Sequence, residues 1–275
     1  MPLIITPVLV LIVMAAGAVA GALGALLGIG GGVFLVPFLN IGLGLPYEIS
    51  IATSLMTVIA TSSAVSAGTT GKNLINLRLG MLLEVGSAAG GLIAALTLEY
   101  LTKRQLYFIF AAVTVAISAI MVSRLDRRNV MPPSVDPGVL GGRFIDETGH
   151  EVVYRTKRLP VALAASFFAG NISGILGIGG GILKVPALNA WCGVPMRAAA
   201  ATSALMIGVT AVSSVPVYYA RGFINPPLAA AAVLGVLAGS RAGLHFAGRS
   251  RARWLKLLMA SVLLAVSAIY FFRAL

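Results

Sequence analysis

The sequence predicts an all-α polytopic membrane protein built from two copies of one unit, and three observations lead to this fold class. Charged residues make up only 10% of the 275 residues and hydrophobic residues 59%, whereas soluble domains carry about 25% charged residues. Apolar runs long enough to cross a bilayer recur along the whole chain. The chain also repeats its own motifs at a fixed offset, and each copy contains a glycine-rich break.

The apolar runs set the expected number of membrane segments, because a crossing helix needs roughly 20 residues. Runs of about this length cover 5–27, 49–70, 79–98, 105–123, 159–176, 198–220, 227–247 and 255–272. Two further runs, 33–42 and 182–191, are too short to cross as helices, so we expect half-helices or re-entrant segments there. The first run is interpreted as a helix and not as a secretion signal, because no basic segment precedes it.

An internal repeat is the most informative feature of the sequence. When the chain is shifted by 149 residues, the segment from about 21 to 94 aligns with a second copy without a gap. The matching pairs include Gly28 to Gly32 with Gly177 to Gly181, Pro37 with Pro186, Asn40 with Asn189, Pro46 with Pro195, and Ala52 to Ser54 with Ala201 to Ser203. We therefore expect a four-segment transmembrane repeat over 1–123, its homologue over 159–275, and a connecting loop over 124–158.

The connecting loop has the composition of a soluble segment. Its stretch GRFIDETGHEVVYRTKR predicts a small β-hairpin with two short strands around an ETGH turn. Its arginines and lysines place it in the cytoplasm by the positive-inside rule. The basic segment 249–256 should then lie on the same side, which eight simple crossings do not allow. One re-entrant segment in the second copy resolves this conflict, so inverted repeats are favoured and parallel repeats are the alternative.

The glycine breaks GIGGGVFLVPFLN (28–40) and GIGGGILKVPALN (177–189) predict a binding site. Irregular backbone at membrane depth is tolerated only inside protein or along a water-filled cavity. Consecutive glycines free N–H groups, and the start of a following helix adds positive potential, so the two together suit an anion. Broken helices in both repeats are typical of secondary transporters. Close helix packing is the alternative interpretation of the glycines. A dinucleotide-binding loop is disfavoured, because Val33 and Ile182 stand where its third glycine would be.

Lys184 is the strongest single indication of an anion site. A lysine in an apolar segment is costly unless it is paired or hydrated. Lys184 has three interpretations: it attracts an anionic substrate, forms a structural ion pair, or snorkels to the interface. Its counterpart in the first copy is Leu35. Duplicated amides and hydroxyls complete the candidate substrate-binding set, which comprises Gly30, Gly31, Gly32, Asn40, Thr53, Ser54, Gly179, Gly180, Gly181, Lys184, Asn189, Thr202 and Ser203.

Three further positions carry specific expectations. Glu84 lies within the third apolar run and is a candidate carrier of a coupling proton, with Arg78 or Arg241 as alternative ion-pair partners. Asn76 and Asn225 precede apolar runs and are expected to cap the helices that follow. The single cysteine, Cys192, is expected to be a small buried hydrophobe.

Several function classes are disfavoured by what the sequence contains. Neither a nucleophile–base pair, nor a metal-ligand cluster, nor an ATP-binding P-loop is apparent, so we expect no enzyme, no metal and no cofactor. The net charge of +12 is distributed over loops between apolar runs, which is typical of membrane proteins rather than of nucleic-acid binding. The expected partners are a small anion and the lipid bilayer, and a homodimer is a further candidate assembly.

A GxGGGxxxVPxL motif in each half, followed by GxP and then ATS, resembles the TauE/SafE family of sulfite and sulfonate permeases. The motif covers Gly28 to Leu39 in the first copy and Gly177 to Leu188 in the second, where MIGVTA follows at 206–211. The resemblance extends over nearly the whole chain outside 124–158. It implies a multi-pass transporter of the bacterial inner membrane that is driven by the proton-motive force. The implied substrates are small sulfur-containing anions such as sulfite, thiosulfate, sulfoacetate and related organosulfonates.

Three functions compete at this point. The favoured one is a secondary transporter, with export as the expected direction, in which one repeat rocks against the other around an anion held at the glycine breaks. The second is a passive anion channel or facilitator with the same filter. The third is a membrane-embedded sensor subunit that uses the loop 124–158 as its reader.

Overall fold

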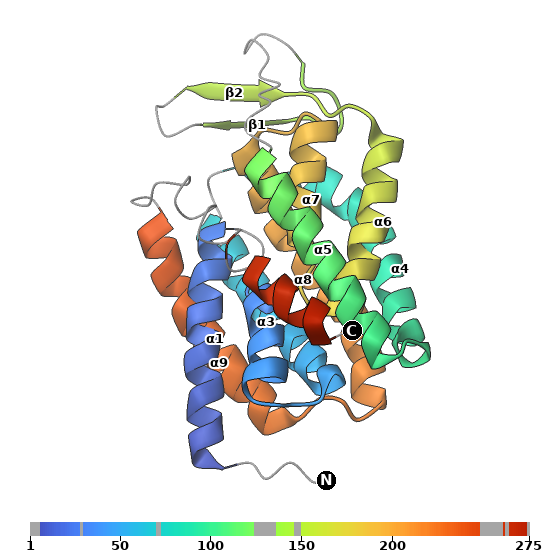
Figure 1. Ribbon diagram of the computed structural model, residues 1–275. Helices are drawn as coiled ribbons and strands as arrows, with labels where there is room; N and C mark the ends of the chain where they lie inside the picture. The colour runs from blue at the N-terminus through green and yellow to red at the C-terminus, as the bar shows by residue number, and fades with distance from the viewer. Residues whose placement is uncertain are drawn as a thin grey trace.

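The protein is an all-α polytopic membrane protein, as the sequence predicts (Figure 1). The structure is a computed structural model, which describes residues 6–27, 30–69, 73–123, 136–145, 150–247, 261 and 264–273. Within these residues, six helices are long and apolar enough to cross a membrane. They are α1 (Pro7–Leu27), α3 (Tyr47–Thr69), α4 (Leu77–Thr97), α6 (Leu159–Leu176), α8 (Met196–Ala220) and α9 (Pro226–Ala247). The long helix α5 (Lys103–Ser123) and a shorter apolar helix over Leu264–Arg273 complete the bundle, with the short 3-10 turn η2 (Leu98–Tyr100) before α5.

Two short broken helices lie where the sequence predicts half-helices. The first is α2 (Gly32–Pro37), which continues into the π-helical turn η1 (Phe38–Gly42). The second is α7 (Gly181–Pro186), which continues into the π-helical turn η3 (Ala187–Trp191). At about 1.5 Å per residue, each spans roughly half of a bilayer's hydrocarbon core. The predicted short segments are therefore confirmed to within a residue at their starts.

The elements of the first half recur about 149 residues later. The bounds of α7 and η3 match those of α2 and η1, and α8 and α9 begin at the positions that match the starts of α3 and α4. In Figure 1, α1 rises from the end that holds the N-terminus, whereas α6 descends from the β-hairpin at the opposite end. Helices α1 and α6 thus run in opposite directions, which is the arrangement that inverted repeats would produce.

The long helices of one half pack mainly on those of the other half. Helix α1 packs against α9, α4 against α6, and α3 against α8. Glycines allow the backbones to approach, because a Cβ at Gly21 or Gly239 on the α1–α9 seam would collide with a main-chain carbonyl across it. The same holds for Gly90 and Gly170 on the α4–α6 seam. Close packing therefore accounts for these glycines.

The predicted hairpin is also confirmed. Strands β1 (Gly142–Ile145) and β2 (Glu151–Tyr154) pair antiparallel, with Phe144 opposite Val152. Most of the ETGH turn lies outside the described residues. Phe144 and Tyr154 are buried in a cluster with Leu79, Met206 and the equally buried Cys192. The hairpin is therefore docked on the starts of α4 and α8, and Cys192 is the small core residue that was expected.

Both predicted asparagine caps are present. Asn76 Oδ1 accepts a hydrogen bond from the Leu79 N–H at 3.1 Å, and Asn225 Oδ1 accepts one from the Leu228 N–H at 3.3 Å. Each bond satisfies one of the N–H groups that the first turn of a helix leaves without a partner. The caps mark where α4 and α9 begin, and the Asn76 cap fixes the start of the helix that carries Glu84.

Candidate functional site

Three side chains from three helices form a buried polar cluster. Lys184 Nζ on α7 donates to Glu84 Oε2 on α4 at 3.1 Å and to Thr210 Oγ1 on α8 at 2.6 Å. The Thr210 hydroxyl in turn donates to Glu84 Oε1. The side chains of Lys184 and Glu84 are 1% and 4% exposed. An ammonium, a carboxylate and a hydroxyl are thus joined in a closed ring, away from solvent.

The glycine break determines where Lys184 lies. Gly179 and Gly180 have φ angles of +78° and +66°, a region that residues with a Cβ rarely adopt. Helix α7 starts directly after this turn, and the Lys184 N–H bonds to the Gly180 carbonyl at 3.1 Å. Lys184 is therefore on the first turn of the short helix, where its side chain reaches between α4 and α8.

The burial of the two charges excludes one interpretation of Lys184 and shows the ion pair that another one expects. Snorkelling does not describe Lys184, because its side chain is almost completely buried. Glu84 pairs with Lys184 and not with Arg78 or Arg241. Removing one partner of such a pair costs about 3–5 kcal/mol, because the other charge is left buried and uncompensated. An intramembrane ionisable pair of this kind indicates a functional site.

The cluster has no charged counterpart in the first half. The positions that match Lys184, Glu84 and Thr210 are Leu35, Val233 and Thr61. Leu35 is fully buried in an apolar cluster, and the Thr61 hydroxyl donates to Thr57 of its own helix at 2.9 Å. The helices are therefore duplicated, whereas the charged side chains occur at only one of the two matching sets of positions, as the leucine at position 35 predicts.

The two glycine breaks lie against each other between α3 and α8. A Cβ at Gly30, whose φ is +76°, or at Gly179 would contact the side chains of both Val58 and Ile207, which occupy matching positions in the two halves. A Cβ at Gly32 would collide with the Gly177 carbonyl. Ser54 Oγ donates to the same carbonyl at 2.6 Å. The structure thus brings together the predicted residues of both breaks, with Ser54 as the link between them.

Other predicted residues form internal contacts instead. Asn40 and Asn189 donate to the Leu45 and Val194 carbonyls, both at 2.9 Å, and so close the turns that follow the broken helices. Thr202 Oγ1 accepts from the Asn76 N–H at 3.0 Å. The Ser203 hydroxyl lies 3.4 Å from the Gly181 carbonyl. Gly31 and Gly180 are closely packed, because a Cβ at either position would collide with the carbonyl of Ala20 or Ala169. These bonds give the asparagines and Thr202 structural roles in this conformation.

Two buried hydroxyls near the breaks have no hydrogen-bond partner among the residues that the structure describes. They belong to Thr53, which was predicted, and to Ser173, which was not. A Cβ at Gly180 would lie 3.2 Å from the Ser173 Cβ, so this serine borders the second break. Its matching residue is Gly24, and this departure from the repeat is the signal that could have identified it. Thr210 was also missed, although it lies in the MIGVTA segment.

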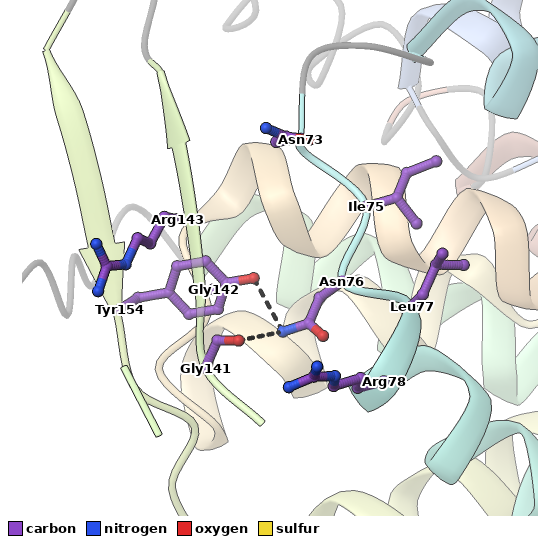
Figure 2. A pocket seen from close by; sticks show the side chains of 9 residues that line it. All are labelled: Asn73, Ile75, Asn76, Leu77, Arg78, Gly141, Gly142, Arg143 and Tyr154. Atoms are coloured by element: carbon purple, nitrogen blue, oxygen red, sulfur yellow. Dashed lines mark hydrogen bonds between the residues drawn. The ribbon is translucent and has the colours of Figure 1, made fainter. Parts of the chain in front are cut away.

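A second polar region lies beneath the hairpin. A pocket of about 500 Å³ separates the hairpin from the start of α4. In Figure 2, the Asn76 side chain donates to the Gly141 carbonyl and to the Tyr154 hydroxyl, both at 3.2 Å. Burial raises the pKa of Tyr154, so the phenol stays neutral at physiological pH. Because the Asn76 N–H also bonds Thr202, this residue joins the hairpin to both α4 and α8.

Comparison with known proteins places these features in a family context. The family model described as "Sulfite exporter TauE/SafE" matches residues 3–270. The chain is 25% identical to the "Probable membrane transporter protein YunE" of Bacillus subtilis over 262 residues, which cover 93% of this chain and 94% of that protein. It is 23% identical to the "Probable membrane transporter protein MJ0441" of Methanocaldococcus jannaschii over 279 residues, covering 95% and 93%. No solved structure matches the chain significantly.

Proposed function

Because the chain belongs to the sulfite exporter TauE/SafE family, we propose that this membrane transporter carries small sulfur-containing anions such as sulfite, thiosulfate or organosulfonates. Export linked to the proton-motive force is the proposed mode. The proposed route is alternating access, with the anion bound where the two glycine breaks meet.

The buried ammonium of Lys184 is the observation that carries this proposal. The backbone of Lys184 lies one turn from a glycine break, and its ammonium is in a region where an unpaired charge is costly. The helix that starts at the break therefore carries a cation that can attract an anion. The unpaired hydroxyls of Thr53 and Ser173 can donate to oxyanion oxygens. They therefore replace Asn40, Asn189 and Thr202 as the preferred polar contacts.

The opposite directions of the matching helices α1 and α6 support alternating access. A site at the contact between two oppositely directed units can open toward either side when one unit rocks against the other. The seams α1–α9 and α4–α6 join the two halves, and glycines bring the backbones close together at both.

A binding and flux experiment tests the substrate class. The purified protein is heated with sulfite, thiosulfate, sulfoacetate, taurine, sulfate or dicarboxylates, because a ligand that binds the folded state raises its melting temperature. Flux of the stabilising anion is then measured in proteoliposomes. We expect Lys184→Met to abolish both effects, whereas Leu35→Met, at the matching position of the first half, leaves them intact.

The outcomes separate the competing functions. Stabilisation only by dicarboxylates would refute the sulfur-anion assignment. Flux that does not saturate and ignores a pH gradient would favour a passive channel. Normal binding by a folded Lys184→Met variant would remove this lysine from the site.

A further inference from the structure

We propose that Glu84 and the transported anion alternate as the partner of Lys184, so that each transported monoanion is accompanied by one proton. This inference rests on the proposed function, and it assigns to that function the charge of the substrate and the stoichiometry of coupling. The contact between Lys184 and Glu84 across the two halves carries it.

The Lys184 ammonium can donate to a further hydrogen-bond partner. A lysine ammonium has three N–H donors, and the described contacts with Glu84 and Thr210 use two of them. Thr210 accepts from Lys184 while it donates to Glu84. Its hydroxyl can therefore hold the ammonium in place while the carboxylate leaves, because the Lys184–Thr210 bond does not depend on Glu84.

Other ionisable groups on the surrounding helices lie away from Glu84. Helix α6, on one side of α4, carries no ionisable side chain between Leu159 and Leu176, and Lys184 is the one such residue of α7. The ionisable residues of α8 lie near its ends, at Arg197, Tyr218 and Tyr219. Besides Glu84, those of α4 and η2 lie at the ends of this helical segment, at Arg78, Glu99 and Tyr100. Those of α5 lie on its first turns, at Lys103, Arg104 and Tyr107. Among the described residues, Lys184 is thus the charged group that contacts Glu84.

The net charge of the cluster then decides which states can change conformation. With Glu84 ionised and Lys184 charged, the empty cluster is neutral. A monoanion bound to Lys184 would leave a net charge of −1, and burying that charge in the membrane is strongly unfavourable. When a proton from the aqueous side binds the Glu84 carboxylate, the loaded cluster is neutral again. Both neutral states can reorient, and they differ by one anion and one proton.

Two properties of transport follow from this exchange. The substrate is a monoanion, such as hydrogen sulfite or a singly charged organosulfonate, because a dianion would leave an uncompensated charge even when Glu84 is protonated. This narrows the proposed substrate class and excludes thiosulfate, which is a dianion at neutral pH. The cycle is electroneutral, so a pH gradient drives it while the membrane voltage does not. Because the anion and the proton move in the same direction, an inward proton gradient drives uptake, and export runs when the outward anion gradient exceeds it.

The test uses radiolabelled methanesulfonate, which is a permanent monoanion, and the full-length protein in proteoliposomes with the voltage clamped by valinomycin and potassium. We expect one proton to enter with each anion, as reported by a trapped pH dye, and no response to an imposed voltage. Sulfate, a dianion, should not be carried. A different stoichiometry, or flux driven by voltage alone, would overturn the inference.

Glu84→Gln gives the sharper result, because glutamine mimics the protonated acid but cannot release a proton. The empty variant then holds an unpaired positive charge and should not reorient, whereas its loaded form is neutral. We expect net uptake to fall at least tenfold while exchange of external for internal methanesulfonate continues near the wild-type rate. Net uptake driven by a pH gradient in this variant would overturn the inference. So would loss of both modes while the anion still stabilises the folded variant.

Two controls separate this result from other failures. The double variant Glu84→Gln with Lys184→Met leaves no charge in the cluster, so it should fold and should lose anion binding. Wild-type protein that carries none of the sulfur anions would overturn the proposed function, and the coupling with it. Wild-type flux with a voltage-driven cycle would overturn the coupling alone.

Discussion

Replacing Lys184 by methionine should destabilise the protein at neutral pH through the charge that it leaves behind. Glu84 would keep its hydrogen bond from Thr210 but lose its cation in a site where its side chain is 4% exposed. Breaking a buried pair in this way costs about 3–5 kcal/mol. At about 2–4 °C per kcal/mol, a loss of about 3 kcal/mol lowers the melting temperature by roughly 6–12 °C.

Thermal unfolding of the purified variants measures this effect. The deficit of Lys184→Met should shrink at acidic pH, because protonation removes the unpaired charge of Glu84. The double variant with Glu84→Gln should lie within about 1 kcal/mol of the wild type or above it, since neutral replacements of a buried pair are often tolerated. Leu35→Met is the matched control, expected to cost under about 1.5 kcal/mol. A single variant as stable as wild type, or a double variant as unstable as the single one, would refute the reasoning.

Three other substitutions test the surrounding structure. Thr210→Val should lower the melting temperature by the equivalent of about 1.5–3 kcal/mol and impair transport. Thr61→Val, at the matching position, is the control, because it loses only a bond within its own helix. Equal transport by both variants would remove Thr210 from the site. Asn76→Ala should expose the hairpin to trypsin, because the Asn76 side chain bonds the hairpin and also caps α4. Asn225→Ala is the control: it should cost only about 1 kcal/mol of capping and leave proteolysis unchanged. Gly90→Leu should reduce the folded yield, because a Cβ there collides with a carbonyl of α6; a normal yield would contradict the close α4–α6 packing.

The sequence by itself determined the elements of the fold, because membrane burial imposes lengths that can be read locally. A crossing helix needs an apolar run of about 20 residues, and the long helices α1 and α6 coincide with such runs. The offset of 149 residues placed the two broken helices, since a glycine-rich break followed by about ten apolar residues allows only a short helix. The caps at Asn76 and Asn225 were equally predictable, because capping depends on neighbours within one turn.

Only the tertiary structure decided how polar residues are used, because their partners are distant in the sequence. Lys184 and Glu84 are 100 positions apart and belong to different halves, so neither periodicity nor spacing indicates their contact. Asn40 and Asn189 suited an anion as well as a turn by residue type, and the fold directs their amides to the carbonyls of Leu45 and Val194. A buried polar group takes whichever partner packing brings within about 3 Å. The residue types therefore specified which interactions were available, and the packing of the two halves selected among them.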